Sequence, residues 1–267
     1  MRLTFDHDYH IHSQLSLCSN DPCQTPESIL EYAEKSGLTE ICLTDHYWDS
    51  DVPGASPWYA KQDFAHISKA LPLPKSDKVK FFFGCETDMD KFMKVGISEN
   101  GFDRFDFIII PTTHLHMKGF TFNEEDGSTA EGRARLWVER LDSLLSQPLP
   151  FHKIGIAHLA CGLTAPASRE MLLDVLNLIP EDEMVRLFTK AASLGVGIEL
   201  NSSDMNFADS EADTVLRMFR IAKSCGCKFY LGSDIHHPAN IEKLTAVFNR
   251  AIDLLGLTED DRFTIQK

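Results

Sequence analysis

DYHIH, residues 8–12, ends the first of seven short, apolar, strand-like runs in this chain of 267 residues. Five further runs carry a histidine or a carboxylate at or next to their ends: EICLTDH (40–46), KFFFGCETD (80–88), DFIIIPTTHLH (106–116), KIGIAHL (153–159) and KFYLGSDIH (228–236). The remaining run, GVGIELNSS (195–203), carries no obvious ligand beyond Asn201. The carboxyl ends of parallel strands converge on one face of an α/β fold. The runs therefore predict one shared site, built from residues that are far apart in the sequence.

Segments with helical spacing alternate with these runs. Residues 25–27, Thr-Pro-Glu, predict the start of the first helix, with Thr25 as its N-cap, and Gly37 predicts its end. Seven strand–helix units without internal repeats predict an α/β fold, a distorted (β/α)7 TIM-like barrel with its site at the C-terminal strand ends. No change in composition marks a second domain, so we expect a single catalytic domain over residues 1–267.

Long loops follow several of the strands and would rise over the ligand-bearing face of such a barrel. They cover residues 47–78, 117–130, 160–180 and 202–210. The first of them contains four prolines together with Trp48, Trp58 and Tyr59, a composition that predicts a partly rigid lid. We expect these loops to shape a substrate pocket.

The charge of the chain limits its partners. A net charge of −14 at pH 7 argues against binding to a long nucleic acid or to an anionic membrane. A small anionic substrate is compatible with this charge if divalent cations offset it locally. No run approaches the roughly 18 apolar residues of a membrane span. The seven cysteines include no CxxC pair, so we expect a reduced, cytoplasmic protein. The sequence leaves the oligomeric state open.

Histidines and carboxylates at strand ends are suitable ligands for zinc, manganese or iron. Residues two apart in a strand face the same side, so His10 and His12 can bind one ion, with Asp8 as a carboxylate that orients them. We prefer His114 to His116 because it lies nearer its strand. One such residue alone is more often structural, but six strand ends together favour a multinuclear metal site. The candidate ligands are His10, His12, His46, Glu86, His114, His158, Asp234 and His236.

Together these motifs resemble the PHP superfamily, named for polymerase and histidinol phosphatase. The matching motifs are DYHIH, LTDH, GCE, a strand-end histidine, AH and GSDIH, which lie within residues 8–236. The resemblance implies a distorted seven-stranded barrel that holds two or three divalent metal ions. It implies one ion among His10, His12, Glu86 and Asp234, a second among Glu86, His114 and His158, and a third at His46 and His236.

The chain departs from the family pattern just after the HxH pair. The family usually supplies another histidine or aspartate there, whereas this chain reads SQLSLCSNDP over residues 13–22. Cys18, Asn20 and Asp21 are the candidates to complete the third metal site.

Clustered divalent ions favour hydrolysis, because they generate a hydroxide near neutral pH and neutralise charge on the substrate. The resemblance implies a phosphoester substrate, and we favour a small phosphomonoester, similar to histidinol phosphate or to a nucleotide. Asp45 and His237 are candidate acids for the leaving alcohol. Candidate cations for the phosphate are Arg133 and Lys118, with Arg135 and Arg169 as further options.

Two other functions stay open. Metal-dependent amidohydrolases, which act on C–N bonds, also begin with HxH, but they use eight strands and a lysine at the end of the fourth. Here that strand ends in PTTHLH and seven strands are predicted. A non-catalytic metal-binding scaffold is the second alternative, and the nearly complete ligand set argues against it.

Overall fold

The computed structural model describes residues 1–19, 21–237 and 243–266. In this part of the chain an eight-stranded parallel sheet has the order β1-β2-β4-β5-β6-β7-β8, and β3 pairs with β4. The strands are β1 (His7–Ile11), β2 (Glu40–Leu43), β3 (His46–Tyr47), β4 (Lys80–Thr87), β5 (Phe107–Pro111), β6 (Ile154–Ala157), β7 (Gly197–Asn201) and β8 (Lys228–Gly232). Each of the seven predicted runs contributes to the sheet. The second run is divided into β2 and β3, with Thr44 and Asp45 between them.

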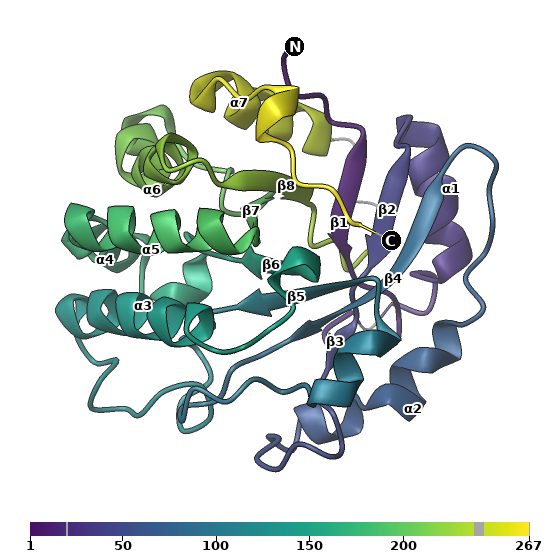
Figure 1. Ribbon diagram of the computed structural model, residues 1–267, viewed down its shortest axis with the longest axis horizontal. Helices are drawn as coiled ribbons and strands as arrows, with labels where there is room; N and C mark the ends of the chain where they lie inside the picture. The colour runs from purple at the N-terminus through teal and green to yellow at the C-terminus, as the bar shows by residue number, and fades with distance from the viewer. Residues whose placement is uncertain (20, 238–242, 267) are drawn as a thin grey trace.

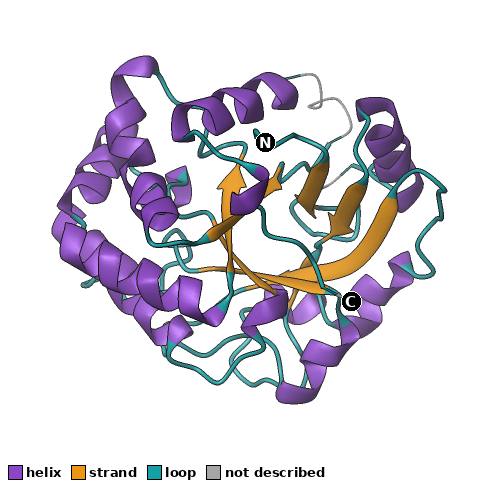
Figure 2. Cartoon of the chain, turned by 45° about the horizontal axis from the view of Figure 1, so that its top comes forward, coloured by secondary structure: helices purple, strands orange, loops and turns teal. Residues whose placement is uncertain are grey.

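The sheet curves until its first and last strands meet. Ile11 forms a parallel bridge with Ile235, just beyond β8. The amide of Asp234 donates to the carbonyl of His10 at 2.7 Å, and the amide of His12 donates to the carbonyl of Ile235 at 3.1 Å. Figure 2 shows the strands surrounded by helices. The structure therefore confirms the predicted barrel, which is closed at the seam between β1 and the end of β8 by a few hydrogen bonds.

Helices cover the outside of the sheet. They are α1 (Pro26–Ser36), α2 (Phe64–Ile67), α3 (Ala130–Leu145), α4 (Arg169–Leu178), α5 (Glu181–Leu194), α6 (Ala212–Ser224) and α7 (Leu244–Leu255). Short 3-10 turns lie at Tyr59–Lys61, Ser68–Ala70, Glu99–Arg104, Phe151–Lys153, Gly162–Thr164, Asp209–Glu211 and Glu259–Asp261. Figure 1 shows α3 to α6 stacked along one side of the molecule and α1 on the opposite side. None of the helices in the described ranges combines the length and the apolar character needed to cross a membrane.

The ends of the first helix agree with the sequence. The hydroxyl of Thr25 accepts a hydrogen bond from the amide of Ser28 at 3.2 Å, which is the predicted N-cap. Gly37 ends the helix with a φ of 72°, a left-handed conformation that costs glycine little. This helix packs Ile29 and Ala33 into the layer between the sheet and the helices.

The inside of the barrel is filled by side chains rather than by solvent. Its buried cluster comprises Tyr9, Cys42, Phe82, Phe107, Ile109, Ala157, Tyr230, Phe263 and Ile265. Gly155 makes room for it, since a Cβ at that position would lie 2.5 Å from the Phe107 ring. Phe263, from the C-terminal segment, packs beside Phe107 with ring centroids 5.6 Å apart. The amide of Phe263 donates to the carbonyl of Phe229 near the start of β8. The amino-terminal end of the barrel is thus plugged, and the carboxyl ends of the strands remain for the candidate site.

Candidate metal centre

Glu86, near the end of β4, lies at the middle of the candidate site. Its carboxylate is buried, and Oε2 lies 3.1 Å from Nδ1 of His46 and 3.3 Å from Nε2 of His12. The same oxygen lies 3.4 Å from Nε2 of His10. Oε1 lies 3.5 Å from Nε2 of His158 and 3.9 Å from Nε2 of His114. One carboxylate therefore faces five imidazoles, which come from β3 and from the ends of β1, β5 and β6.

Asp234 faces three of these imidazoles, those of His10, His12 and His158, from just beyond β8. Its Oδ1 lies 3.1 Å from Nε2 of His12 and 3.5 Å from Nε2 of His10, and its Oδ2 lies 3.6 Å from Nε2 of His158. The residue has a φ of 55°, a conformation that non-glycine residues rarely adopt. Nδ1 of His236 lies 3.6 Å from Oδ1 of Asp234. The structure thus brings all eight predicted ligands together.

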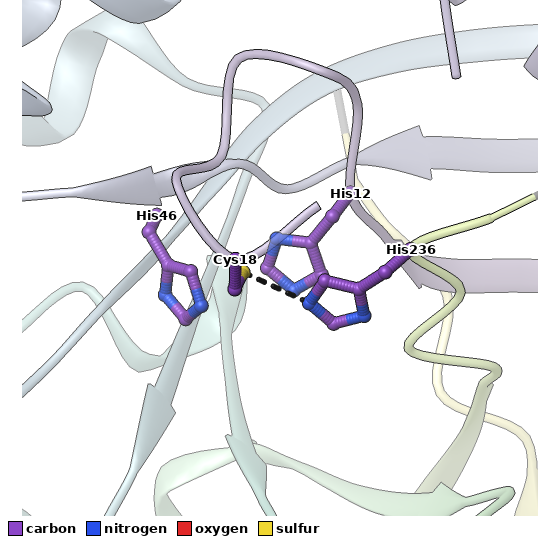
Figure 3. Close-up of side chains that lie close together, drawn as sticks. All are labelled: His12, Cys18, His46 and His236. Atoms are coloured by element: carbon purple, nitrogen blue, oxygen red, sulfur yellow. Dashed lines mark hydrogen bonds between the residues drawn. The ribbon is translucent and has the colours of Figure 1, made fainter. Parts of the chain in front are cut away.

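Cys18 adds a ninth candidate ligand. Its sulfur lies 3.0 Å from Nε2 of His236, and ligand atoms of His12, Cys18, His46 and His236 all lie within 4.8 Å of one another. Figure 3 shows these four side chains directed toward a common point. Of the other predicted candidates, Asp21 pairs instead with His237, at 2.8 Å, and Asn20 lies outside the described residues.

The loop that carries Cys18 is fixed from several sides. The hydroxyl of Ser16 donates to Oδ1 of Asp45 at 2.7 Å and accepts from the amide of His46 at 3.0 Å. The hydroxyl of Ser19 donates to the carbonyl of His236 at 2.9 Å. These contacts hold the loop against the ends of β2 and β8, so the thiol position is determined by the fold.

Three further groups within the described residues hold ligand atoms within 4.8 Å of one another. They are His10, His12 and Asp234; His10, Glu86 and His158; and His158, Cys161 and Asp204. The first two agree broadly with the ion positions that the resemblance implies. The group of His158, Cys161 and Asp204 is less suitable for binding a metal ion. Burial raises the pKa of Asp204 to about 7, and Oδ2 of Asp204 already accepts from the amide of Ala160.

Buried acceptors orient the imidazoles. Nδ1 of His10 donates to Oε1 of Glu199 at 2.6 Å, and Oε2 of Glu199 also accepts from the amide of His158 at 3.1 Å. Nδ1 of His114 donates to Oδ2 of Asp88 at 2.8 Å. In each case the Nε2 atom is left to face Glu86. Carboxylates that fix the outer nitrogen of a ligand histidine are a regular feature of metal sites.

Two of these orienting groups add to the sequence-based expectations. The run that contains Glu199 carries no obvious ligand beyond Asn201, yet Glu199 is buried and contacts two candidate ligands. Its position between Ile198 and Leu200 is the signal that could have identified it, because a single charge in a buried strand faces the barrel interior. Asp8 was expected to orient the HxH pair. The pairing register shifts between Asp8 and Ile11, and Oδ1 of Asp8 accepts from the backbone amides of His10 and Ser233.

The site passes a test for metal binding that does not depend on resemblance. Nδ1 of His46, Oε1 of Glu86 and Nε2 of His114 are buried and have no hydrogen-bond partner among the described residues. Leaving such groups unpaired is costly unless an ion takes up their lone pairs. Burial raises the pKa of Glu86, but the nearby His46 and His10 imidazoles outweigh this and hold it well below its usual range. Burial holds the pKa of His46 well below its usual value. An ionised carboxylate and a neutral imidazole are the forms that bind metal. Burial lowers the pKa of His10, but the charges of Glu199 and Asp234 outweigh this and raise it well above its usual value, so a metal ion would displace a proton from this imidazole.

The cluster lies at the bottom of a cavity of about 510 Å³. Lys118 lines this cavity, with a side chain that is 57% exposed and paired with Glu124. The other predicted cation and the predicted acids lie elsewhere. Arg133 is not a lining residue, because its Nη1 donates to the carbonyls of Leu115 and Thr164. Asp45 accepts from the hydroxyls of Ser13 and Ser16, and His237 is an exposed residue outside the cavity wall.

Comparison with known proteins agrees with this geometry. The family model of the PHP domain matches residues 8–203. The chain belongs to the PHP domain family. A probable phosphatase from Caldicellulosiruptor bescii is 24% identical over 217 residues, which are 80% of this PHP chain and 74% of that protein. This assignment confirms the resemblance and the predicted enzyme class, a metal-dependent phosphoesterase.

A solved PHP-like structure shares the fold. It is the histidinol phosphate phosphatase of Lactococcus lactis subsp. lactis, complexed with zinc, L-histidinol and phosphate. The two chains are 21% identical with a TM-score of 0.65, and the match covers 95% of this chain and 94% of that chain. This likeness supports the barrel architecture over nearly the whole length of both proteins.

Proposed function

We propose that the protein hydrolyses small phosphomonoesters, with two or three divalent ions held at the carboxyl ends of the strands. The observation that carries this proposal is the position of Glu86, a buried carboxylate surrounded by five imidazoles, three of which have a buried nitrogen without a hydrogen-bond partner among the described residues. A cavity of about 510 Å³ suits a small molecule, since ligand sites of this kind measure roughly 300–1,000 Å³.

The ligands divide into three sets. His10, His12 and Asp234 would hold one ion with Glu86, and Glu86, His158 and His114 would hold a second. His46, His236 and Cys18 would hold the third, because Nε2 of His12 faces Asp234 and its Nδ1 contacts the hydroxyl of Ser16. The third set would supply two imidazoles and a thiolate, a combination typical of zinc. Bound divalent ions supply Lewis acidity, which lowers the pKa of water and offsets the charge on phosphate oxygens.

The remaining side chains of the site would position these ligands and the substrate. Glu199 and Asp88 keep the Nε2 atoms of His10 and His114 directed at Glu86. Lys118, at the cavity wall, is the cation that we assign to the phosphate, because Arg133 is engaged by backbone carbonyls. Asp45 accepts hydrogen bonds from Ser13 and Ser16, and His237 pairs with Asp21. Neither of them lines the cavity, so we assign neither to proton transfer.

A panel assay of the zinc- and manganese-loaded protein tests the proposal. Phosphomonoesters should be hydrolysed at least about a hundred-fold faster than phosphodiesters or amides. Each substrate should be compared with and without a chelator, and the rate should fall with metal content. Hydrolysis of amides alone would favour the amidohydrolase alternative. Stoichiometric metal with no hydrolysis of any substrate class would leave a metal-binding scaffold as the better description.

A further inference from the structure

The wall of the cavity above the metal centre is mostly apolar. Beyond the candidate ligands, the described lining residues are Trp58, Tyr59, Met117, Phe120 and Leu163, together with Ser56, His116 and Lys118. They come from the three predicted loops after β3, β5 and β6. The wall is continuous with the centre, since the ring of Trp58 packs edge-on against His46 with centroids 4.9 Å apart.

Packing contacts and hydrogen bonds fix the side chains of this wall. The ring of Tyr59 is buried, and its hydroxyl donates to Oδ2 of Asp88 at 3.3 Å. Trp58 and Phe120 pack on Tyr59 with ring centroids 4.8 and 5.6 Å away. Behind them Trp48 is buried and donates from Nε1 to the carbonyl of Val52 at 2.8 Å. The half-buried faces of Trp58 and Phe120 are therefore fixed in place before a ligand arrives, which lowers the entropic cost of binding.

The charges in the wall limit what it can bind. Among the described lining residues the carboxylates are Glu86 and Asp234, and both belong to the metal centre. An ammonium group on the substrate would be moved from water to this wall without an anionic partner, which is unfavourable. An uncharged ring would cover aromatic surface and gain the energy of apolar burial and ring stacking.

We propose that Trp58, Phe120, Met117 and Leu163 form the subsite for the leaving group, and that this group carries an uncharged planar ring and no amine. This inference rests on the proposed phosphomonoesterase function. In the reaction, the oxygen of water bonds to phosphorus and the P–O bond to the ring-bearing alcohol breaks. The alcohol oxygen takes up a proton, and the products are inorganic phosphate and a neutral alcohol.

Matched esters test the subsite on the zinc-loaded protein. The compounds 3-phenylpropyl phosphate and 2-amino-3-phenylpropyl phosphate differ by one amino group, and glycerol 1-phosphate lacks a ring. We expect the phenyl ester without the amine to have the lowest KM, below those of the other two esters by at least about ten-fold. Equal KM values, or a lower KM for the amine, would overturn the inference while leaving the phosphatase function intact.

Substitutions in the wall test whether these residues cause the preference for the phenyl ester. Leu163→Ala and Met117→Ala, which remove apolar wall away from the Trp58–His46 contact, should each reduce the preference for the phenyl ester over glycerol phosphate several-fold. Phe92→Ala is the matched control, because Phe92 is 79% exposed and does not line this cavity. A preference unchanged in both wall variants would count against the subsite.

Binding of compounds that cannot be hydrolysed distinguishes the proposed subsite from the proposed phosphomonoesterase function. Calorimetry with 3-phenylpropylphosphonate and methylphosphonate, which cannot be hydrolysed at the P–C bond, should show tighter binding of the phenyl compound. If the phenyl preference appears in binding while every ester resists hydrolysis, the proposed function fails and the subsite stands. If the phosphonates bind equally, the subsite is wrong whatever the hydrolysis rates.

Discussion

The sulfur of Cys18 lies 3.0 Å from Nε2 of His236, although the two residues are 218 positions apart in the chain. Nδ1 of His236 donates to the carbonyl of Asp234 at 2.7 Å, so its Nε2 is directed toward the thiol. Burial raises the pKa of Cys18 well above its usual value, so the thiol is protonated unless a cation replaces the proton. The position where the family usually has histidine or aspartate is thus filled by a soft candidate ligand, the thiol of Cys18.

The first prediction concerns this thiol. Protein loaded with Co²⁺ should show a thiolate-to-cobalt charge-transfer band, and Cys18→Ser should remove it along with about one ion per chain. Cys23→Ser is the matched control, because Cys23 is also exposed and lies on the same segment. A charge-transfer band that survives in Cys18→Ser, or that disappears in Cys23→Ser, would contradict this ligand assignment.

The second prediction concerns the central carboxylate. Glu86→Gln should reduce hydrolysis at least about a hundred-fold and lower the metal content, because an amide brings no charge to the ions. Asp234→Asn should act in the same direction. Glu125→Gln, at an exposed position, serves as the control. Near-normal turnover of Glu86→Gln, with metal content unchanged and the circular dichroism spectrum retained, would show that the centre is misassigned.

The third prediction concerns Glu199. Glu199→Ala frees Nδ1 of His10 and the amide of His158, so the dissociation constant of the ions should rise about 10–100-fold. Competition with a chromogenic chelator measures this constant directly. Asp88→Asn, the corresponding change behind His114, should weaken binding in the same way. A loss of activity without weaker metal binding would assign Glu199 a different role.

The fourth prediction concerns stability. An ion that binds only the folded state at about 100 times its dissociation constant stabilises that state by about 2.7 kcal/mol. For a chain of this size, removing it should lower the Tm by roughly 5–10 °C. Calorimetry with and without chelator, followed by re-addition of zinc, measures the shift. An unchanged Tm after verified removal would mean that the folded and unfolded chains bind the ions equally well.

The barrel and the convergence of eight candidate ligands could be predicted because both depend on local patterns. A short apolar run predicts a strand, and the residue that ends it must lie on the carboxyl face, as Glu86 and His158 do. The place of Glu199 in an apolar run predicts that it faces the barrel interior, but its partners could not be predicted, because they depend on which strand lies beside β6. The position of Arg133 could not be predicted for a similar reason, since a sequence does not indicate that a guanidinium will donate to two backbone carbonyls.

The position of Cys18 could be predicted only in part. The departure from the family pattern identified it as one of three candidates, but a loop residue has no periodicity that fixes its direction. Which of the three candidates faces the metal centre depends on contacts of Ser16 and Ser19. The hydroxyl of Ser16 joins Asp45 to the amide of His46, and Ser19 contacts His236. These are contacts between distant segments, and only the folded structure contains them.

The closure of the barrel beside the metal centre has a consequence for how the protein is made. His10 and His12 belong to the first strand, while Asp234 and His236 follow the last one, so these ligands are synthesised at nearly opposite ends of the chain. They meet only when the seam between Ile11 and Ile235 forms. A nascent chain that has not yet emerged as far as His236 would therefore offer an ion an incomplete set of candidate ligands. If ions bind as proposed, capture of the full complement would follow the closure of the barrel rather than precede it.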